Sequence, residues 1–330
     1  MRLEDIGFYS LSDKRACNVT IDSQMQRCEM IINEYCNFKC PYCKGLANEV
    51  FNDKKRKELT IEEIKRNIDL WCDNGPLINI RFSGGEPTYH KDIIEAVRYS
   101  KKKGIKRIAI STNGSNTNEM YQRLIDAGCN DFSISLDADN ALIGDNMAGG
   151  IKGSWLKVVN NIKWISKKTY VTVGIVLELK NINTFIGIVN YASNLGVADI
   201  RVISSAQWDK PLTELTNIDA TLLNKHPILK YRVTNFIKGK KIRGLSYSDS
   251  NSCALVLDDS IIAGGHHYPC VIYMREQGKP IGMVNENMRA ERIEWFKNTN
   301  TRNDKICMKN CLDVCVDYNK KALAKLMAGC

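Results

Sequence analysis

The 330-residue sequence has no apolar run close to the roughly 18 residues that a membrane-spanning helix requires. Its first residues carry the acids Glu4 and Asp5 and lack the apolar block and small-residue cleavage site of a secretory signal. No internal repeat or low-complexity tract interrupts it. These absences make a cytoplasmic location, away from membranes, the expectation.

Cysteine, by contrast, is abundant, with 13 residues in the chain. A reducing cytosol makes a disulfide framework unexpected, so clustered cysteines there indicate metal ligands. Three fall within residues 36–43 and three within 307–315, with Cys253 and Cys270 between these groups. Small buried hydrophobes are the simpler interpretation of the isolated cysteines, which are Cys17, Cys28, Cys72 and Cys129.

The charge pattern weakly favours an anionic substrate or partner. The formal net charge is +10, and basic residues cluster in Lys54–Lys57 and in Lys230–Arg243, where Tyr231 and Phe236 are interleaved. A phosphorylated or carboxylated metabolite, a nucleotide or a nucleic-acid base would suit such segments. Solvated surface is the simpler interpretation of each segment alone.

Short apolar runs alternate with amphipathic stretches from about residue 29 to residue 204. Strands are predicted at residues 29–35, 77–83, 106–111, 131–136, 170–177 and 199–204. Helices are predicted from Thr60, whose spacing to Glu63 is a capping box, and at 90–103, 119–127, 155–166 and 184–195. Six such units predict an α/β fold with a parallel sheet, a partial (β/α)6 barrel too short to close with eight strands.

Composition suggests four segments along the chain. Residues 1–28 form an N-terminal extension, 29–204 the partial barrel, and 205–250 a linker or insertion that contains the basic stretch. Residues 251–330 are rich in cysteine with weak periodicity, as expected of a small C-terminal domain held by a metal site.

Cys36, Cys40 and Cys43 follow directly after the first predicted strand. Three thiolates within eight residues are able to face one site, and on a four-iron cluster they leave one iron open, as a catalytic metal site requires. Zinc, the alternative, normally takes four protein ligands, and no fourth cysteine is adjacent.

Polar and glycine residues follow the next three predicted strands. Paired glycines at 84 and 85 let a ligand approach the backbone, and the carboxylate of Glu86 is suited to an ammonium group. Ligands bind at the carboxyl ends of strands in such sheets. The polar side chains at these ends are Ser111, Asn113, Ser135 and Asp137, for which a turn or helix cap is the alternative.

Together, Cys36-x3-Cys40-x2-Cys43, Gly84-Gly85-Glu86 and the polar strand ends resemble the radical S-adenosylmethionine (SAM) superfamily over residues 29–204. The resemblance implies a 4Fe–4S cluster on the three cysteines and SAM as cofactor. Gly84, Gly85 and Glu86 would then bind the methionine amino group. Four further residues would contact the ribose or the methionine carboxylate, namely Ser111, Asn113, Ser135 and Asp137, and Tyr42 would lie beside the adenine.

The C-terminal cysteines resemble a second element of that superfamily. Cys253, then Gly265-x4-Cys270, followed by Cys307, Cys311 and Cys315, is similar to the SPASM and Twitch auxiliary-cluster regions. Its spacings depart from the full SPASM pattern, so one auxiliary 4Fe–4S cluster is expected. Its ligands would be Cys253, Cys270 and two of the other three, or three thiolates with substrate on the fourth iron. A structural zinc site, with His266 or His267, is the alternative.

The resemblance implies an enzyme, of oxidoreductase or isomerase type, that cleaves SAM reductively with electrons from a donor such as flavodoxin or ferredoxin. The resulting 5′-deoxyadenosyl radical would abstract hydrogen and lead to oxidation or rearrangement of the substrate. A small anionic or nucleotide-type substrate is favoured over a DNA or RNA base. A peptide comes last, because only about 35 residues precede Cys36, too few for a leader-binding domain. An iron–sulfur electron carrier or redox sensor would leave Gly84–Glu86 unexplained.

Overall fold

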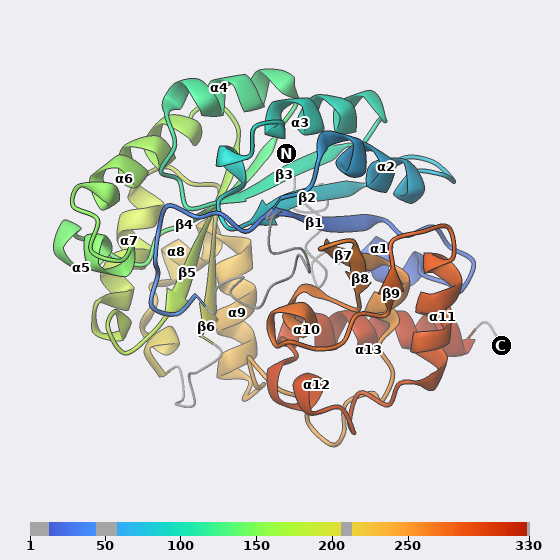
Figure 1. Ribbon diagram of the computed structural model, residues 1–330. Helices are drawn as coiled ribbons and strands as arrows, with labels where there is room; N and C mark the ends of the chain where they lie inside the picture. The colour runs from blue at the N-terminus through green and yellow to red at the C-terminus, as the bar shows by residue number, and fades with distance from the viewer. Residues whose placement is uncertain (1–12, 44–57, 206–212, 329–330) are drawn as a thin grey trace.

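The computed structural model describes residues 13–43, 58–205 and 213–328. Within them, nine strands form one sheet in the order β6-β5-β4-β3-β2-β1-β7-β8-β9. The first six are parallel (Figure 1): β1 (Arg27–Asn33), β2 (Asn79–Gly84), β3 (Arg107–Thr112), β4 (Asp131–Ser135), β5 (Tyr170–Leu177) and β6 (Asp199–Ser204). The sheet is not closed, which confirms the predicted partial barrel.

Amphipathic helices cover the outer face of this sheet (Figure 1). They are α2 (Ile61–Trp71), α3 (Ile93–Lys102), α4 (Asn118–Ala127), α6 (Ser154–Ile165) and α7 (Phe185–Asn194). The capping box predicted at Thr60 and Glu63 is present, with both reciprocal hydrogen bonds. Two short elements, η2 (Pro87–Tyr89) and α5 (Ala141–Met147), lie in the connections after β2 and β4.

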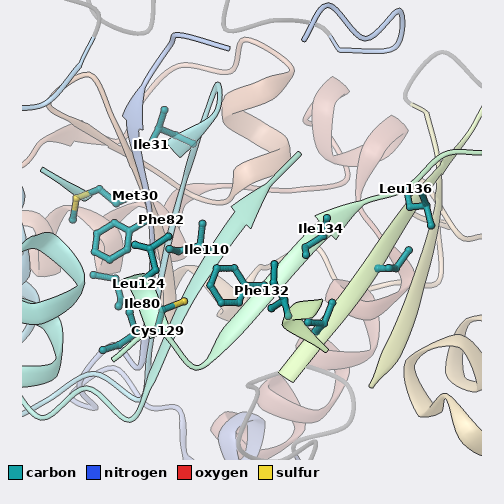
Figure 2. Packing of buried hydrophobic residues seen from close by; sticks show 14 of the residues in the cluster. Met30, Ile31, Ile80, Phe82, Ile110, Leu124, Cys129, Phe132, Ile134 and Leu136 are labelled. Atoms are coloured by element: carbon teal, nitrogen blue, oxygen red, sulfur yellow. The ribbon is translucent and has the colours of Figure 1, made fainter. Parts of the chain in front are cut away.

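The two faces of the sheet differ in chemistry, because successive side chains of a strand point to opposite sides. Met30, Phe82, Ile110 and Phe132 occupy adjacent register positions on the outer face. Figure 2 shows them in the apolar core, together with Leu124 of α4. The intervening inner positions are largely polar and include Glu29, Arg81, Ser111, Ser133 and Arg201. The helices therefore bury one face, and the other lines the inside of the partial barrel.

The segment after β6 folds onto the barrel. It contains η4 (Thr213–Asn217), α8 (Ala220–Lys225) and α9 (Pro227–Ile237). Leu229 and Val233 of α9 belong to the same buried core as the strands. Part of the basic stretch 230–243 serves internal contacts, since Arg232 pairs with Asp313 and Lys240 with Asp317. The run 54–57 lies outside the described residues.

The C-terminal region extends the same sheet. β7 (Asp259–Ala263) pairs in parallel with β1, and β8 (His266–Tyr268) and β9 (Gly282–Met283) follow antiparallel. Around them lie η5 (Ala254–Leu257), α10 (Val271–Arg275), α11 (Met288–Asn298), α12 (Lys305–Asn310) and α13 (Asp313–Ala328), which contacts α1 (Asp13–Asn18). The four segments predicted from composition stay a prediction. Strands from before and after residue 250 belong to one sheet, so the sheet does not mark a boundary there. No helix of the described ranges is long and apolar enough to cross a bilayer.

Truncating the outer-face core should destabilise the fold in proportion to the cavity that it leaves. Phe132, completely buried on β4, contacts the Tyr121 ring edge-on at 5.7 Å. The substitution Phe132→Ala is expected to lower the free energy of unfolding by about 3–5 kcal/mol, measured by denaturant titration. Leu156→Ala on α6, where the side chain is 55% exposed, should change it by about 0.5 kcal/mol or less. Equal effects of the two would contradict the described core.

Candidate functional site

The segments that follow β1 and β2 are in direct backbone contact at the carboxyl edge of the sheet. Gly85 N–H donates to Asn33 O at 2.9 Å, and Glu86 N–H donates to Tyr35 O at 2.6 Å. A Cβ atom at Gly85 would collide with the carbonyl oxygens of Glu34 and Tyr35. Glycine is therefore required at 85 so that the turn after β2 can hold the chain that enters the cysteine loop.

Glu86 is fully buried, and its carboxylate joins the ends of β2 and β3. Oε1 accepts from Thr88 N (3.1 Å), Thr88 Oγ1 (2.7 Å) and Thr112 Oγ1 (2.7 Å). Oε2 accepts from Asn113 N at 2.6 Å. Burial raises the pKa of Glu86, and these donors oppose the rise. Four donors match the roughly four lone-pair positions of a carboxylate, so an ammonium group would have to share them. The predicted contact with the amino group stays a prediction.

The cysteine loop is anchored from two sides. Cys36 Sγ accepts from Phe38 N at 3.4 Å and Asn113 Nδ2 at 3.8 Å, donors that would stabilise a thiolate. On the other side, Lys39 N–H donates to Ala148 O at 3.0 Å. The structure therefore places Cys36, Cys40 and Cys43, which the sequence predicted as ligands, in the loop that follows β1.

The three thiols lie near enough to one another for electrostatic coupling. Burial raises the pKa of Cys40 to about 12, and Asp137, Cys43 and Cys36 add to the rise. No three His, Cys, Asp or Glu side chains in the described ranges converge tightly enough for a single metal ion. A four-iron cluster takes each thiolate on a different iron, so its ligands stand apart by the width of the cluster. Three soft sulfur donors on one loop fit that group.

Tyr42 and Asp137 connect the loop to the end of β4. Tyr42 Oη donates to Asp137 Oδ2 at 2.5 Å, and Val176 N–H donates to Asp137 Oδ1 at 2.7 Å. Burial raises the pKa of Asp137 to about 6, against the lowering effect of these two donors. Ser111 Oγ accepts from Arg81 at 3.3 Å, and Ser135 at the tip of β4 is exposed. The polar strand ends therefore gather at one edge, and their cofactor contacts stay predictions.

Two supporting contacts had no signal in the sequence. Asn37 accepts from Asn113 Nδ2 at 2.9 Å, and its own amide donates to Ser115 Oγ at 3.0 Å, which ties the cysteine loop to the end of β3. Ala148 acts only through its backbone carbonyl, so no choice of side chain could have marked it.

The C-terminal cysteines come from four elements. Cys253 precedes η5, Cys270 precedes α10, Cys307 and Cys311 lie in and directly after α12, and Cys315 lies in α13. Asn319 Nδ2 donates to Cys253 Sγ, and Tyr273 N donates to Cys270 Sγ, both at 3.4 Å.

The five thiols lie close enough to shift one another's pKa values. Burial raises the pKa of Cys307, and Cys253 and Cys270 add to the rise. A hydrogen bond with Cys315 raises the pKa of Cys311. His267, in contrast, has both ring nitrogens engaged, with Glu291 Oε2 at 2.8 Å and Arg292 Nη1 at 3.3 Å. This removes His267 as a candidate zinc ligand, whereas for His266 a contact of Nδ1 alone, with Gly264 O at 3.1 Å, is seen in the described ranges. The five thiols near the hairpin β7–β8 are one more than a single cluster takes.

Comparisons with known proteins match the barrel part of the chain. Residues 30–192 match the model of the radical SAM superfamily. The chain is 29% identical to a PqqA peptide cyclase of Bradyrhizobium diazoefficiens over 54% of this chain and 45% of that protein. It is 32% identical to a GTP 3′,8-cyclase of Vibrio vulnificus over 32% of each chain. The chain thus spans less than half the length of these curated relatives.

Solved structures support the fold beyond the matched domain. Streptococcus suis SuiB bound to S-adenosylmethionine superposes with a TM-score of 0.59 at 16% identity, over 84% of this chain and 66% of that one. The protein anSMEcpe with bound AdoMet gives 0.57 at 14% identity, over 92% and 96%. At these identities the likeness concerns the fold alone.

The close contact at Gly85 predicts that replacing this glycine by alanine damages the cysteine loop selectively. In Gly85→Ala, the new Cβ pushes the chain at residues 34–35 away, and the iron bound after anaerobic reconstitution should fall by about four atoms per chain. Gly196→Ala is the control, because a Cβ there meets open space. Its φ of +82° strains alanine, whereas the φ of Gly85 does not, so the control shows the effect of backbone strain without the close contact. Full iron content in Gly85→Ala would contradict the described packing.

Proposed function

The chain belongs to the radical SAM superfamily, and we propose that it cleaves SAM reductively to a 5′-deoxyadenosyl radical that abstracts hydrogen from an anionic substrate. The observation that carries this proposal is the gathering of Cys36, Cys40 and Cys43 beside Gly84–Glu86 at the carboxyl edge of the sheet. The bound cluster would supply the electron for that cleavage.

Each side chain of this edge has a role in the proposal. The three thiolates would hold three irons of the cluster and would leave the fourth open for the amino and carboxylate groups of SAM. Gly84 and Gly85 hold the chain that enters the cysteine loop, and together with Glu86 they would bind the methionine amino group of SAM. Asn113 is held at the cysteine loop, because its amide donates to Asn37 and to the thiol of Cys36, and it would contact SAM from that position. Ser111 and Ser135 reach the ribose or the carboxylate.

Tyr42 and Asp137 form the adenosine side of the proposed site. Their 2.5 Å hydrogen bond fixes the ring beside the loop, where an aromatic face can stack on adenine.

We propose further that residues 251–330 hold one auxiliary 4Fe–4S cluster. Its ligands would be Cys253 and Cys270 with two of Cys307, Cys311 and Cys315, which the mutual coupling of these thiols supports. Such a cluster would accept an electron from the substrate radical, making the reaction a net oxidation, or would shape the substrate site. A flavodoxin or ferredoxin would reduce the cluster on the cysteine loop.

An anionic small molecule or nucleotide is the favoured substrate. The names of the relatives include a cyclase of a peptide and a cyclase of GTP, and SuiB is known bound to a precursor peptide, SuiA. A peptide is therefore the second candidate. The polar inner face with its arginines favours the anion. Modification of DNA or RNA has less support, since Arg232 and Lys240 of the basic stretch are used internally.

The first test is SAM cleavage by the anaerobically reconstituted protein with dithionite. The wild type should form 5′-deoxyadenosine and methionine, measured by liquid chromatography. The triple variant C36A/C40A/C43A should form none and should lose about four irons per chain. Cys17→Ser should match the wild type, because this cysteine of α1 belongs to neither cysteine group and is exposed, not buried as its sequence context suggested. A wild-type protein that binds iron and yields no 5′-deoxyadenosine would instead be an electron carrier or sensor.

The second test separates the two cluster sites. The double variant C253S/C270S should lose about four irons per chain and still convert SAM to 5′-deoxyadenosine, because the loop ligands are intact. Metal analysis and the same product assay measure both properties. Zinc in the wild-type protein, with iron unaffected by C253S/C270S, would overturn the auxiliary cluster.

A further inference from the structure

Most arginines on the inner face of the sheet have acidic partners. Arg27 Nη1 lies 2.6 Å from Asp259 and Nη2 lies 3.4 Å from Glu29. Arg107 pairs closely with Asp131, and Arg81 lies 3.7 Å from the same carboxylate. Ion pairing compensates the burial of these charges. These three arginines pair with Glu29 of β1, Asp131 of β4 and Asp259 of β7.

Arg201 on β6 has no such partner within the described ranges. Its guanidinium makes one hydrogen bond, from Nη2 to Ser133 Oγ at 3.4 Å, and its buried Nε has no partner there. The side chain lies across Gly174 of β5, where a Cβ would be 3.5 Å from Nη2. The side chain as a whole is half-buried, and Glu29 offsets part of its charge without forming an ion pair with it. A partly buried guanidinium that lacks an ion-pair partner costs stability, which makes Arg201 a candidate for binding an anion.

Arg243 is held at the end of the same strand. Its Nη2 donates to the carbonyl of Ser204, the last residue of β6, at 3.1 Å, and Nη1 reaches Asn310 O at 3.5 Å. Its Nε is also buried and without a partner in the described part of the chain. Carbonyl oxygens orient this guanidinium. Burial lowers the pKa of Arg243, and the carboxylate of Glu276 opposes that fall and offsets part of the charge.

Arg275 at the end of α10 completes the group from the C-terminal region. It is exposed and forms no ion pair with the described residues. Burial lowers the pKa of Arg201 to about 10 and that of Arg243 below its usual value. Arg275 adds to both falls, whereas Glu29 opposes the first and Glu276 the second. The thiol of Cys311 is close enough to Arg243 to raise the pKa of this arginine. The three cations thus lie between β6 and the C-terminal cysteines.

We propose that Arg201, Arg243 and Arg275 bind one anionic group of the substrate, a phosphate or a carboxylate, between β6 and the C-terminal cysteine cluster. This inference rests on the proposed function and names the residues that select its substrate. Guanidinium forks donate paired hydrogen bonds that match the oxygens of either anion. Bound there, the substrate would lie between the carboxyl edge of the sheet and the proposed auxiliary cluster.

The test is anion-dependent thermal stabilisation of the anaerobic, SAM-loaded holoenzyme. Inorganic phosphate and malonate are compared with potassium chloride at equal ionic strength. At tenfold the dissociation constant, binding contributes about 1.4 kcal/mol, so the wild-type Tm should rise by about 1–4 °C. The anion with the larger effect identifies the phosphate or carboxylate class.

Matched variants locate the effect. Arg201→Met and Arg275→Met, the latter at an exposed position that tolerates change, should each lose at least half of the rise in Tm. Arg98→Met removes an exposed arginine of α3 and should keep it. Equal shifts in all four proteins, or no shift in the wild type, would overturn the proposal.

SAM cleavage by the wild type without any anion is measured in parallel. Its absence would contradict the proposed function, whereas the pattern of Tm shifts judges the arginine site independently.

Discussion

The contact between the chain after β1 and the turn after β2 determines the rest of the site. Asn33 and Tyr35 give their carbonyl oxygens to the amides of Gly85 and Glu86, and this contact is close enough to exclude any side chain at 85. Glu86 then turns inward and receives the amide of Asn113. Asn113 in turn contacts Cys36. One backbone pairing thereby fixes the start of the cysteine loop relative to three strand ends.

A second constraint is the difference between the two faces of the sheet. The outer face is apolar and covered by helices, which supplies the stability of the fold. The inner face is then available for polar groups, and ion pairs such as Arg27–Asp259 neutralise most of them. Because β7 adds to β1 on the other side, the C-terminal cysteines follow directly from the same sheet. The two proposed cluster sites therefore both follow strands of the same sheet.

The sequence predicted the barrel well, because its strands are short apolar runs bounded by glycine and polar residues. The strands at 170–177 and 199–204 match the structure at both ends, and the first strand is displaced by two residues. β7 escaped prediction, since its partner β1 lies about 230 residues earlier and local patterns carry no information on such pairing. The helix at 227–237 was hidden by its basic residues. Arg201 gave no signal, because its isolation appears only once the acids of other strands are placed.

The central claim is that three thiolates leave one iron of the loop cluster open for SAM. Mössbauer spectroscopy of the protein reconstituted with ⁵⁷Fe, in the C253S/C270S background that removes the auxiliary site, tests this most directly. One iron in about four should change its isomer shift on addition of SAM, because only the iron without a thiolate gains nitrogen and oxygen ligands. A spectrum that SAM leaves unchanged would contradict the account.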